Sequence, residues 1–189
     1  MKKYIILAAA LLLSSAVALR AQNNNSKTTL KLQGVEMVET MSADGMSMEK
    51  RPYRWFAGMA EADLQSVAVE MAQLEAYAAV SRVIENIVST KAERATLGVD
   101  GRVQKAIKSY WEQMSMSIQH ACEPFGDTEV SYNSETGLYE VIAKVGIRGD
   151  RYVKLLDGAR DTQPEGLSAE EAQAFIEINE TIIDAAKGN

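Results

Sequence analysis

The longest uninterrupted pattern in this chain runs from Met59 to Arg94 and contains no glycine or proline. Residues of high helix propensity dominate it, above all alanine, glutamate, leucine, methionine and glutamine. Apolar residues recur at three- and four-residue steps in two stripes, which together are wider than a coiled-coil seam. The first stripe is Leu64, Val67, Met71, Leu74 and Ala78, and the second is Val69, Ala72, Ala76, Val80, Val83 and Ile87. We therefore expect a long central helix, packed on a sheet.

The segments on either side of this helix predict strands. Residues 28–42 alternate between apolar and polar positions, and the phase changes at Gly34, which is typical of a bulged strand. A loop is expected over residues 43–52, followed by a short strand over 53–58. Residues 127–149 predict a hairpin around the turn sequence NSETG. In its second strand one face is apolar, which indicates an antiparallel sheet with one buried side: Tyr139, Val141, Ala143, Val145 and Ile147.

Three further helices complete the expected fold. A second long helix over 102–122 ends before Pro124, and a short helix follows over residues 150–160. The last helix begins with a capping box, Ser168 with Glu171 three residues later. Its apolar stripe either folds back on the core or meets a partner. The predicted fold class is α+β: a long central helix and a second helix packed on a small antiparallel sheet, plus a C-terminal helix.

The N-terminus has the features of a secretory signal peptide. Lys2 and Lys3 precede an apolar run from Ile5 to Val17, and small residues follow. The run is shorter than the roughly 20 residues of a membrane-spanning helix, so no integral span is expected. Cleavage after Ala18 or Ala21 fits the pattern, and we favour Ala21. No cysteine lies near either position, so no lipid anchor is expected.

These observations give a domain organisation and a broad class of protein. We expect a signal peptide over 1–21, a polar tether over 22–27, an α+β domain over 28–158, and a linker with the C-terminal helix over 159–189. Removal of residues 1–21 changes the net charge from −6 to −9, because three basic residues and no acidic residue are lost. An acidic chain of this kind is a poor partner for nucleic acid or an anionic membrane, and neither is expected.

The only histidine and the only cysteine, His120 and Cys122, lie two residues apart. A zinc site needs about four ligands, and residues two apart on a helix point about 200° away from each other. We therefore expect Cys122 to pack inward and His120 to face solvent. No nucleophile elbow, phosphate-binding loop or dinucleotide fingerprint is present. The prediction is a non-enzymatic protein with no cofactor, no metal site and no catalytic residues.

Methionines gather in the N-terminal region, and methionine-rich surfaces accommodate varied partners. Trp55 lies close to them in the sequence, although filling of the core is the alternative for this residue. The apolar stripe of the last helix is a second possible contact region. The predicted interaction surface is Met41, Met46, Met48, Trp55, Phe175, Ile178 and Ile182. A small basic group is formed by Arg148, Arg151 and Lys154. It could hold an anionic group, and a solvated strand end is its simpler interpretation.

The order of elements also resembles a known family. The segments AEADLQSVAVEMAQLEAYAAVSRVIENIV, SYWEQ and GLYEVIAKVGI are similar to those of the LPP-twenty lipoprotein family, which is related to the N-terminal domain of the flagellar T-ring assembly protein. The resemblance covers roughly residues 54–157. It implies a structural or interaction module of the Gram-negative cell envelope, without catalytic residues to transfer. This chain lacks the lipid-accepting cysteine of the lipoprotein members, which favours a soluble periplasmic or outer-surface location.

The leading functional hypothesis is therefore an exported, non-enzymatic, envelope-associated module that acts through protein–protein contacts. Its partner would be an envelope protein or further copies of the same chain in a homo-oligomer. The alternative hypothesis is a periplasmic small-molecule binding protein, with a pocket between the sheet and the long helix.

Overall fold

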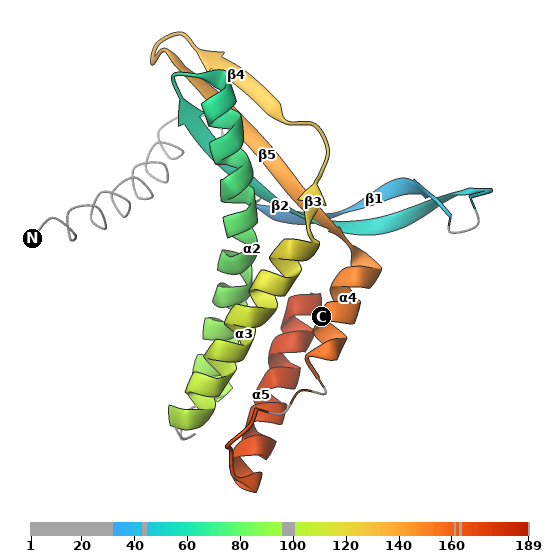
Figure 1. Cartoon of the computed structure of the whole chain (residues 1–189), viewed down its shortest axis with the longest axis vertical. Coiled ribbons are helices and arrows are strands. Elements are labelled where there is room, and N and C mark those ends of the chain that lie inside the picture. The colour runs from blue at the N-terminus through green and yellow to red at the C-terminus, as the bar shows by residue number, and fades with distance from the viewer. Residues whose placement is uncertain (1–31, 43–44, 96–100, 161, 163, 189) are drawn as a thin grey trace, which may run out of the picture. The chain divides into compact units, whose positions relative to one another are not determined.

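The computed structural model describes residues 32–188, except 43–44, 96–100, 161 and 163 (Figure 1). The predicted signal peptide and polar tether lie outside the described residues. The described part is an α+β fold, as predicted, with helices packed on an antiparallel sheet. In chain order the elements are β1 (Gln33–Met41), β2 (Met48–Ala62), α2 (Gln65–Ala95), α3 (Gly101–Ala121), β3 (Glu123–Pro124), β4 (Glu129–Asn133), β5 (Leu138–Arg148), α4 (Gly149–Gly158) and α5 (Ala169–Lys187).

The sheet has the strand order β1-β2-β5-β3, and β4 also pairs with β5. Every pairing is antiparallel. The predicted hairpin of β4 and β5 is confirmed, and so is the buried face of β5. Four alternate side chains of that strand are each 1% exposed and pack toward the helices: Val141, Ala143, Val145 and Ile147. Period-two alternation was therefore a reliable guide to this strand.

Strand β2 is longer than the sequence indicated. It begins at Met48 and ends at Ala62, so it includes half of the predicted loop and the predicted start of the long helix at Met59. The final residues pair with β5, from Met59 opposite Ile142 to Ala62 opposite Tyr139. Helix propensity is a weak preference, and strand pairing overrides it here. The long helix α2 therefore begins at Gln65.

The expected bulge in the first strand is absent. The register between β1 and β2 is unbroken from Gln33 opposite Phe56 to Met41 opposite Met48. Gly34 has a different role, because a Cβ atom there would lie only 2.6 Å from Cζ2 of the Trp55 side chain. The indole of Trp55 thus covers a position where no side chain fits, which is a known way of shielding a glycine in a strand.

Helix α2 packs on the sheet through its smallest residues. Ala68, Ala72 and Ala76 are each 0% exposed, and Gly58 of β2 lies directly beneath the last two. Two members of the second predicted stripe, Ala72 and Ala76, are thus buried. The first stripe is not, because a side chain of leucine size would hold the helix away from the strand. Its members Leu64, Val67, Met71 and Leu74 are 59%, 38%, 47% and 63% exposed.

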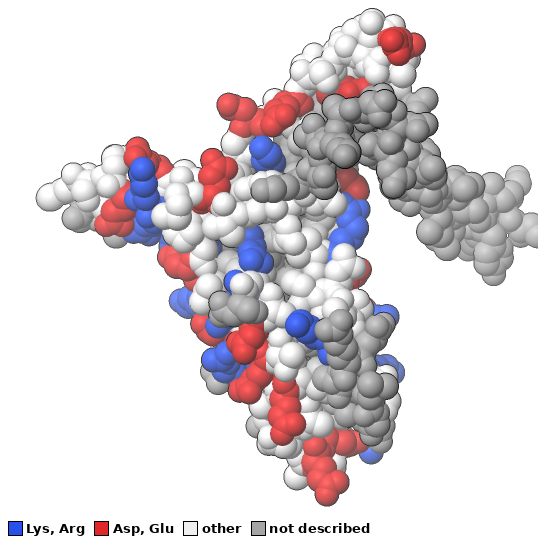
Figure 2. Space-filling view, turned by 180° about the vertical axis from the view of Figure 1, so that it is seen from behind, with Lys and Arg blue, Asp and Glu red and all other residues white. Residues whose placement is uncertain are grey.

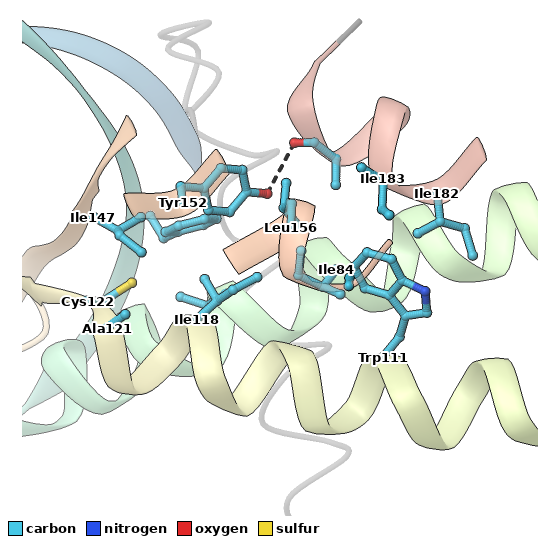
Figure 3. Close-up of a cluster of buried hydrophobic side chains, with 14 of the residues drawn as sticks. Ile84, Trp111, Ile118, Ala121, Cys122, Ile147, Tyr152, Leu156, Ile182 and Ile183 are labelled. Carbon is cyan, nitrogen blue, oxygen red and sulfur yellow. Dashed lines mark hydrogen bonds between the residues drawn. The ribbon is translucent and has the colours of Figure 1, made fainter. Parts of the chain in front are cut away.

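The lower part of α2 joins α3, α4 and α5 in a larger core (Figure 3). Trp111 of α3 lies among Ile84, Ile182 and Ile183 from the neighbouring helices. Its indole nitrogen donates a hydrogen bond to Oδ1 of Asn179 over 3.0 Å. Nδ2 of Asn179 in turn donates to the carbonyl oxygen of Ala159 over 2.8 Å. These buried polar groups satisfy one another, which fixes α5 against both α3 and the end of α4.

Helix α5 is part of this core, so its apolar stripe folds back on the rest of the chain and is not left exposed for a partner. Phe175, Ile178 and Ile182 are 0%, 4% and 0% exposed. The expectation that these three side chains form an interaction surface is therefore corrected. The predicted capping box of Ser168 and Glu171 is present at the start of the helix.

The C-terminal end of α5 is held by the sheet and by α4. The carbonyl oxygen of Ala186 accepts hydrogen bonds from Nη1 of Arg54, over 2.7 Å, and from the hydroxyl of Tyr152, over 3.1 Å. Figure 3 shows the second of these bonds. A cation at a helix C-terminus also interacts favourably with the helix dipole. Of the described helices, none combines the length and the apolar composition needed to cross a membrane.

Candidate interaction surface

Strand β1 and the first part of β2 form a two-stranded ribbon that extends beyond the rest of the sheet (Figure 1). Strand β5 pairs with β2 only from Tyr53 onward, so residues Met48–Pro52 pair with β1 alone. At the end of the ribbon the Ser42 N–H donates to the Ser47 carbonyl over 2.8 Å, which continues the same register into the turn. We call this ribbon, residues 33–52, the projecting hairpin.

One face of the projecting hairpin carries an uncovered apolar stripe. Residues directly opposite each other in an antiparallel pair share a face, and Phe56, which is on this face, is buried beneath the helices. The stripe is therefore the helix-facing side of the sheet, continued past the point where the helices end. Its apolar members are Val35, Met37, Met41 and Met48, which are 62%, 57%, 66% and 61% exposed. The ion pair of Glu39 and Lys50 lies on the same face, between Met37 and Met41.

Both basic side chains of the projecting hairpin lie in ion pairs. Nζ of Lys50 lies 3.8 Å from Oε1 of Glu39, and Nη2 of Arg51 lies 2.8 Å from Oε2 of Glu49. In Figure 2 the projecting end bears red and blue side chains next to each other, with uncharged atoms beyond them. Exposed pairs of this kind contribute little to stability. Because each pair is neutral, the two ion pairs add no strong electrostatic field of either sign to the apolar stripe.

The structure brings part of the predicted surface together. Met41 and Met48 lie directly opposite each other, and Met46 in the connecting turn is 89% exposed. Trp55 is partly buried on the other face of the sheet, where its ring covers Gly34 and lies 5.4 Å from Nζ of Lys144. It is a packing residue of that face and is not a member of the stripe.

Val35 and Met37 belong to the stripe and were missing from the predicted surface. Their signal was present in the sequence, since they share the odd-numbered alternation with Met41. That alternation was assigned to a bulged strand within the sheet. The unbroken register shows that it continues to the end of the hairpin.

A second exposed apolar patch lies on the outer side of α2. It comprises Leu64, Val67, Met71 and Leu74, over the first three turns of the helix. Below it the same side of the helix becomes polar, where Arg82 forms an ion pair with Glu75. The patch is therefore confined to the part of α2 that covers the smaller, alanine-lined core.

A recess of about 240 Å³ lies at the end of α3, between Tyr53, Glu123 and Arg151. Arg148 also lines it, but its guanidinium is engaged by Asp150 through two hydrogen bonds of 2.8 and 2.7 Å. That pairing lowers the pKa of Asp150 and raises the pKa of Arg148. Asp150 thus neutralises Arg148, one of the three members of the basic group noted in the sequence. Among the described residues, no three His, Cys, Asp or Glu side chains gather closely enough to hold a metal ion.

The alternative hypothesis required a pocket between the sheet and the long helix. At Gly58 that interface is closed, because even a Cβ atom would overlap the backbone of Ala72 and Ala76. The neighbouring side chains in the interface are alanines and Val141, all buried. Direct contact between the helix backbone and the strand leaves no room for a ligand at this place.

Cys122 and His120 lie as the helical geometry predicted. Cys122 is 7% exposed and its neighbour Ala121 packs in the same core, whereas His120 is exposed. Burial raises the pKa of the Cys122 thiol to about 12, from an ordinary value of 9.0. The reactive species of cysteine is the thiolate, so the folded protein holds this group in its unreactive form.

We expect iodoacetamide at pH 8 to alkylate Cys122 only slowly in the folded protein and readily in denaturant. A raised pKa also means that the native state favours the protonated thiol. The stability that this group contributes is complete below about pH 9 and is lost as the pH rises toward about 12. Mass spectrometry of the alkylated chain over time measures the first effect. Equal alkylation rates with and without denaturant would show that the thiol is accessible.

Comparison with known proteins places the chain in no family. No protein-family model matches it, and no curated protein matches it. Among solved structures, it is similar to the secreted protein HP1454 from Helicobacter pylori, with 12% sequence identity and a TM-score of 0.28. The match covers 69% of this chain and 52% of that chain, so this chain spans about half the length of that protein. A likeness this weak carries no argument about function.

Proposed function

We propose that this protein is an exported, non-enzymatic module that acts in the cell envelope through protein–protein contacts made by the projecting hairpin. The observation that carries the proposal is the apolar stripe on that hairpin, in which four side chains on one face are each more than half exposed. Contiguous apolar patches on a soluble protein mark contact sites, because leaving them in water is unfavourable.

The chemistry of the stripe supports protein contact rather than catalysis. Three of its four members are methionines, whose flexible, polarizable side chains adapt to surfaces of different shape. The nearby charges are paired with each other and are not arranged around a cavity. The N-terminal sequence supports export, and the resemblance to the LPP-twenty lipoprotein family supports an envelope role as part of the same proposal.

Site-specific photocrosslinking in the native cell tests the contact. A photoreactive amino acid at Met48 is expected to yield a discrete covalent adduct with another protein molecule. The matched control is the same amino acid at Glu180, which is exposed on α5 but lies outside the hairpin. The photoreactive amino acid must be incorporated at both positions. If neither position then gives a discrete adduct, or if both give the same adduct, the hairpin is not the contact site.

Export is tested separately by fractionation and mass spectrometry of the mature N-terminus. Cleavage after Ala21 leaves Gln22 as the first residue, and cleavage after Ala18 leaves Leu19. Recovery of the full-length chain in the cytoplasm alone would contradict export without bearing on the hairpin.

A further inference from the structure

The outer edge of β1 is an open edge of the sheet. In the described part of the chain, β1 pairs only with β2, over nine residues without a break in the register. An edge strand presents a row of backbone donors and acceptors that can pair with another strand. Natural proteins usually block such edges with proline, lysine, a bulge or a covering segment.

The register identifies which backbone groups of β1 are open. The carbonyl of Leu32 accepts from Ala57, and the N–H of Ser42 donates to Ser47, at the two ends of one ladder. Hydrogen-bonded and non-hydrogen-bonded positions alternate along such a ladder. The even-numbered residues of β1 therefore bond to β2, and the odd-numbered residues turn their backbone groups to the open edge: Val35, Met37, Glu39 and Met41.

The opposite edge of the projecting hairpin is blocked. From Met48 to Pro52, strand β2 does not pair with β5, so the outer side of this part of β2 is also open. Pro52, which has no N–H, occupies an outward position there, and Lys50 occupies the next one. Strand β1, by contrast, contains no proline and no lysine, and its two charged residues are Glu36 and Glu39. The hairpin is thus more strongly protected against pairing on one edge than on the other.

We infer that β1 pairs with β1 of a second copy of this chain, antiparallel about a two-fold axis, to form one continuous sheet. This inference rests on the proposed function and names the partner of the same hairpin. A two-fold interface brings the same surface from both copies together, so the strand must be complementary to itself. The sequence of β1 meets this requirement in a register that is centred on Val38.

In that register, no two carboxylates face each other. Val38 lies opposite Val38 of the second copy, Glu36 opposite Thr40, Met37 opposite Glu39, and Val35 opposite Met41. Centring the pair on Glu39 or on Glu36 instead would set that glutamate against its own copy, which is unfavourable. The odd-numbered residues of the two copies would exchange about eight backbone hydrogen bonds. The apolar stripes would then adjoin on one face of the joined sheet.

The oligomeric state of the mature chain tests the inference. Sedimentation velocity is expected to show a concentration-dependent dimer for the wild type and a monomer for Met37→Pro. Proline at 37 removes an outward N–H and leaves the bonds to β2 intact. The matched control is Lys50→Pro, which removes an outward N–H from the other edge and is expected to leave the dimer unchanged. If Met37→Pro does not fold, Met37→Glu instead sets a carboxylate directly opposite Glu39 of the second copy, which is unfavourable.

A cysteine at the two-fold axis tests the register. In the Cys122→Ala background, Val38→Cys is expected to form a disulfide-linked dimer without reductant. Positions that directly face each other in a non-hydrogen-bonded pair lie about 4.5 Å apart at Cα, within the range of a disulfide. Glu36→Cys, which faces Thr40, is the control and is expected to form no disulfide-linked dimer under the same conditions.

Distinct results separate this inference from the proposed function. A wild-type chain that stays monomeric at several hundred micromolar, or a dimer that survives both Met37→Pro and Met37→Glu, overturns pairing through β1. If the Met48 photocrosslink then joins the chain to a different protein, the hairpin remains a contact site with another partner. An adduct of twice the chain mass that Met37→Glu abolishes supports the pairing.

Discussion

A carboxylate at position 141 is expected to abolish cooperative folding. Val141 is 1% exposed on β5, beneath Ala68 and Ala72 of α2, where neither a polar partner nor space for hydration is present among the described residues. An uncompensated buried charge costs about 3–5 kcal/mol, and the lost burial of the valine adds to this. Domains of this size are stable by only about 5–15 kcal/mol. Val141→Asp should therefore unfold or become a loosely packed state.

Urea unfolding followed by circular dichroism checks this result against a neighbouring variant. Ile142→Asp places the same charge on the next residue of β5, which points to the opposite, half-exposed face. It should keep a sigmoidal transition with a midpoint near that of the wild type. A sharp unfolding transition for Val141→Asp, together with the loss of a cooperative transition for Ile142→Asp, would mean that the faces of β5 are reversed.

The parts of the fold that could be predicted are those in which one periodicity stands alone. In β5, apolar residues occupy every second position from Tyr139 to Ile147, whereas the other face carries Glu140, Lys144 and Arg148, so one face is the clear candidate for burial. In α3 the helical spacing of Val103, Ile107 and Ile118 marks one buried side, and all three are buried. Local signals also identified the end of α3 and the capping box of α5. In each case short-range chemistry and long-range packing favour the same structure.

The orientation of α2 could not be predicted, because both of its stripes are apolar. The hydrophobic effect alone favours burial of the larger side chains Leu64 and Leu74, but these are the exposed ones. The deciding factor is how closely the helix backbone approaches β2 at Gly58, which is a property of two segments together. Only alanines fit at that distance. The alanines within residues 59–94 permit a close approach, but nothing in that segment identifies Gly58 as the point of contact.

The same limit explains why the predicted interaction surface contains both exposed and buried residues. Met41 and Met48 are exposed, since residues around a turn sequence are seldom buried. The stripe of α5 was ambiguous, because an amphipathic helix has the same spacing whether it covers its own core or meets a partner. Asn179, which is invisible as a core residue in the sequence, decides the outcome by bonding to Trp111 and Ala159.

Addition of a single methyl group at position 58 should be the second most damaging change. In Gly58→Ala the new Cβ would overlap the carbonyl oxygen of Ala72 and the nitrogen of Ala76, which are backbone atoms of α2. Backbone atoms cannot rotate away, so the helix must move as a body from the strand. Overpacking costs typically 1–3 kcal/mol, and we expect about 3 kcal/mol here. In thermal unfolding, this corresponds to a loss of about 6–12 °C in Tm for a chain of this length.

The glycine of the neighbouring strand provides a control that separates backbone from side-chain crowding. In Gly146→Ala the added Cβ would lie 2.7 Å from the ring of Phe125, a half-buried side chain that can turn aside. We expect a loss of about 1 kcal/mol for this variant, measured in the same thermal scans. Equal losses for the two variants would show that α2 yields as easily as a phenyl ring. The alanine contact with β2 would then not be what determines which side of α2 is exposed.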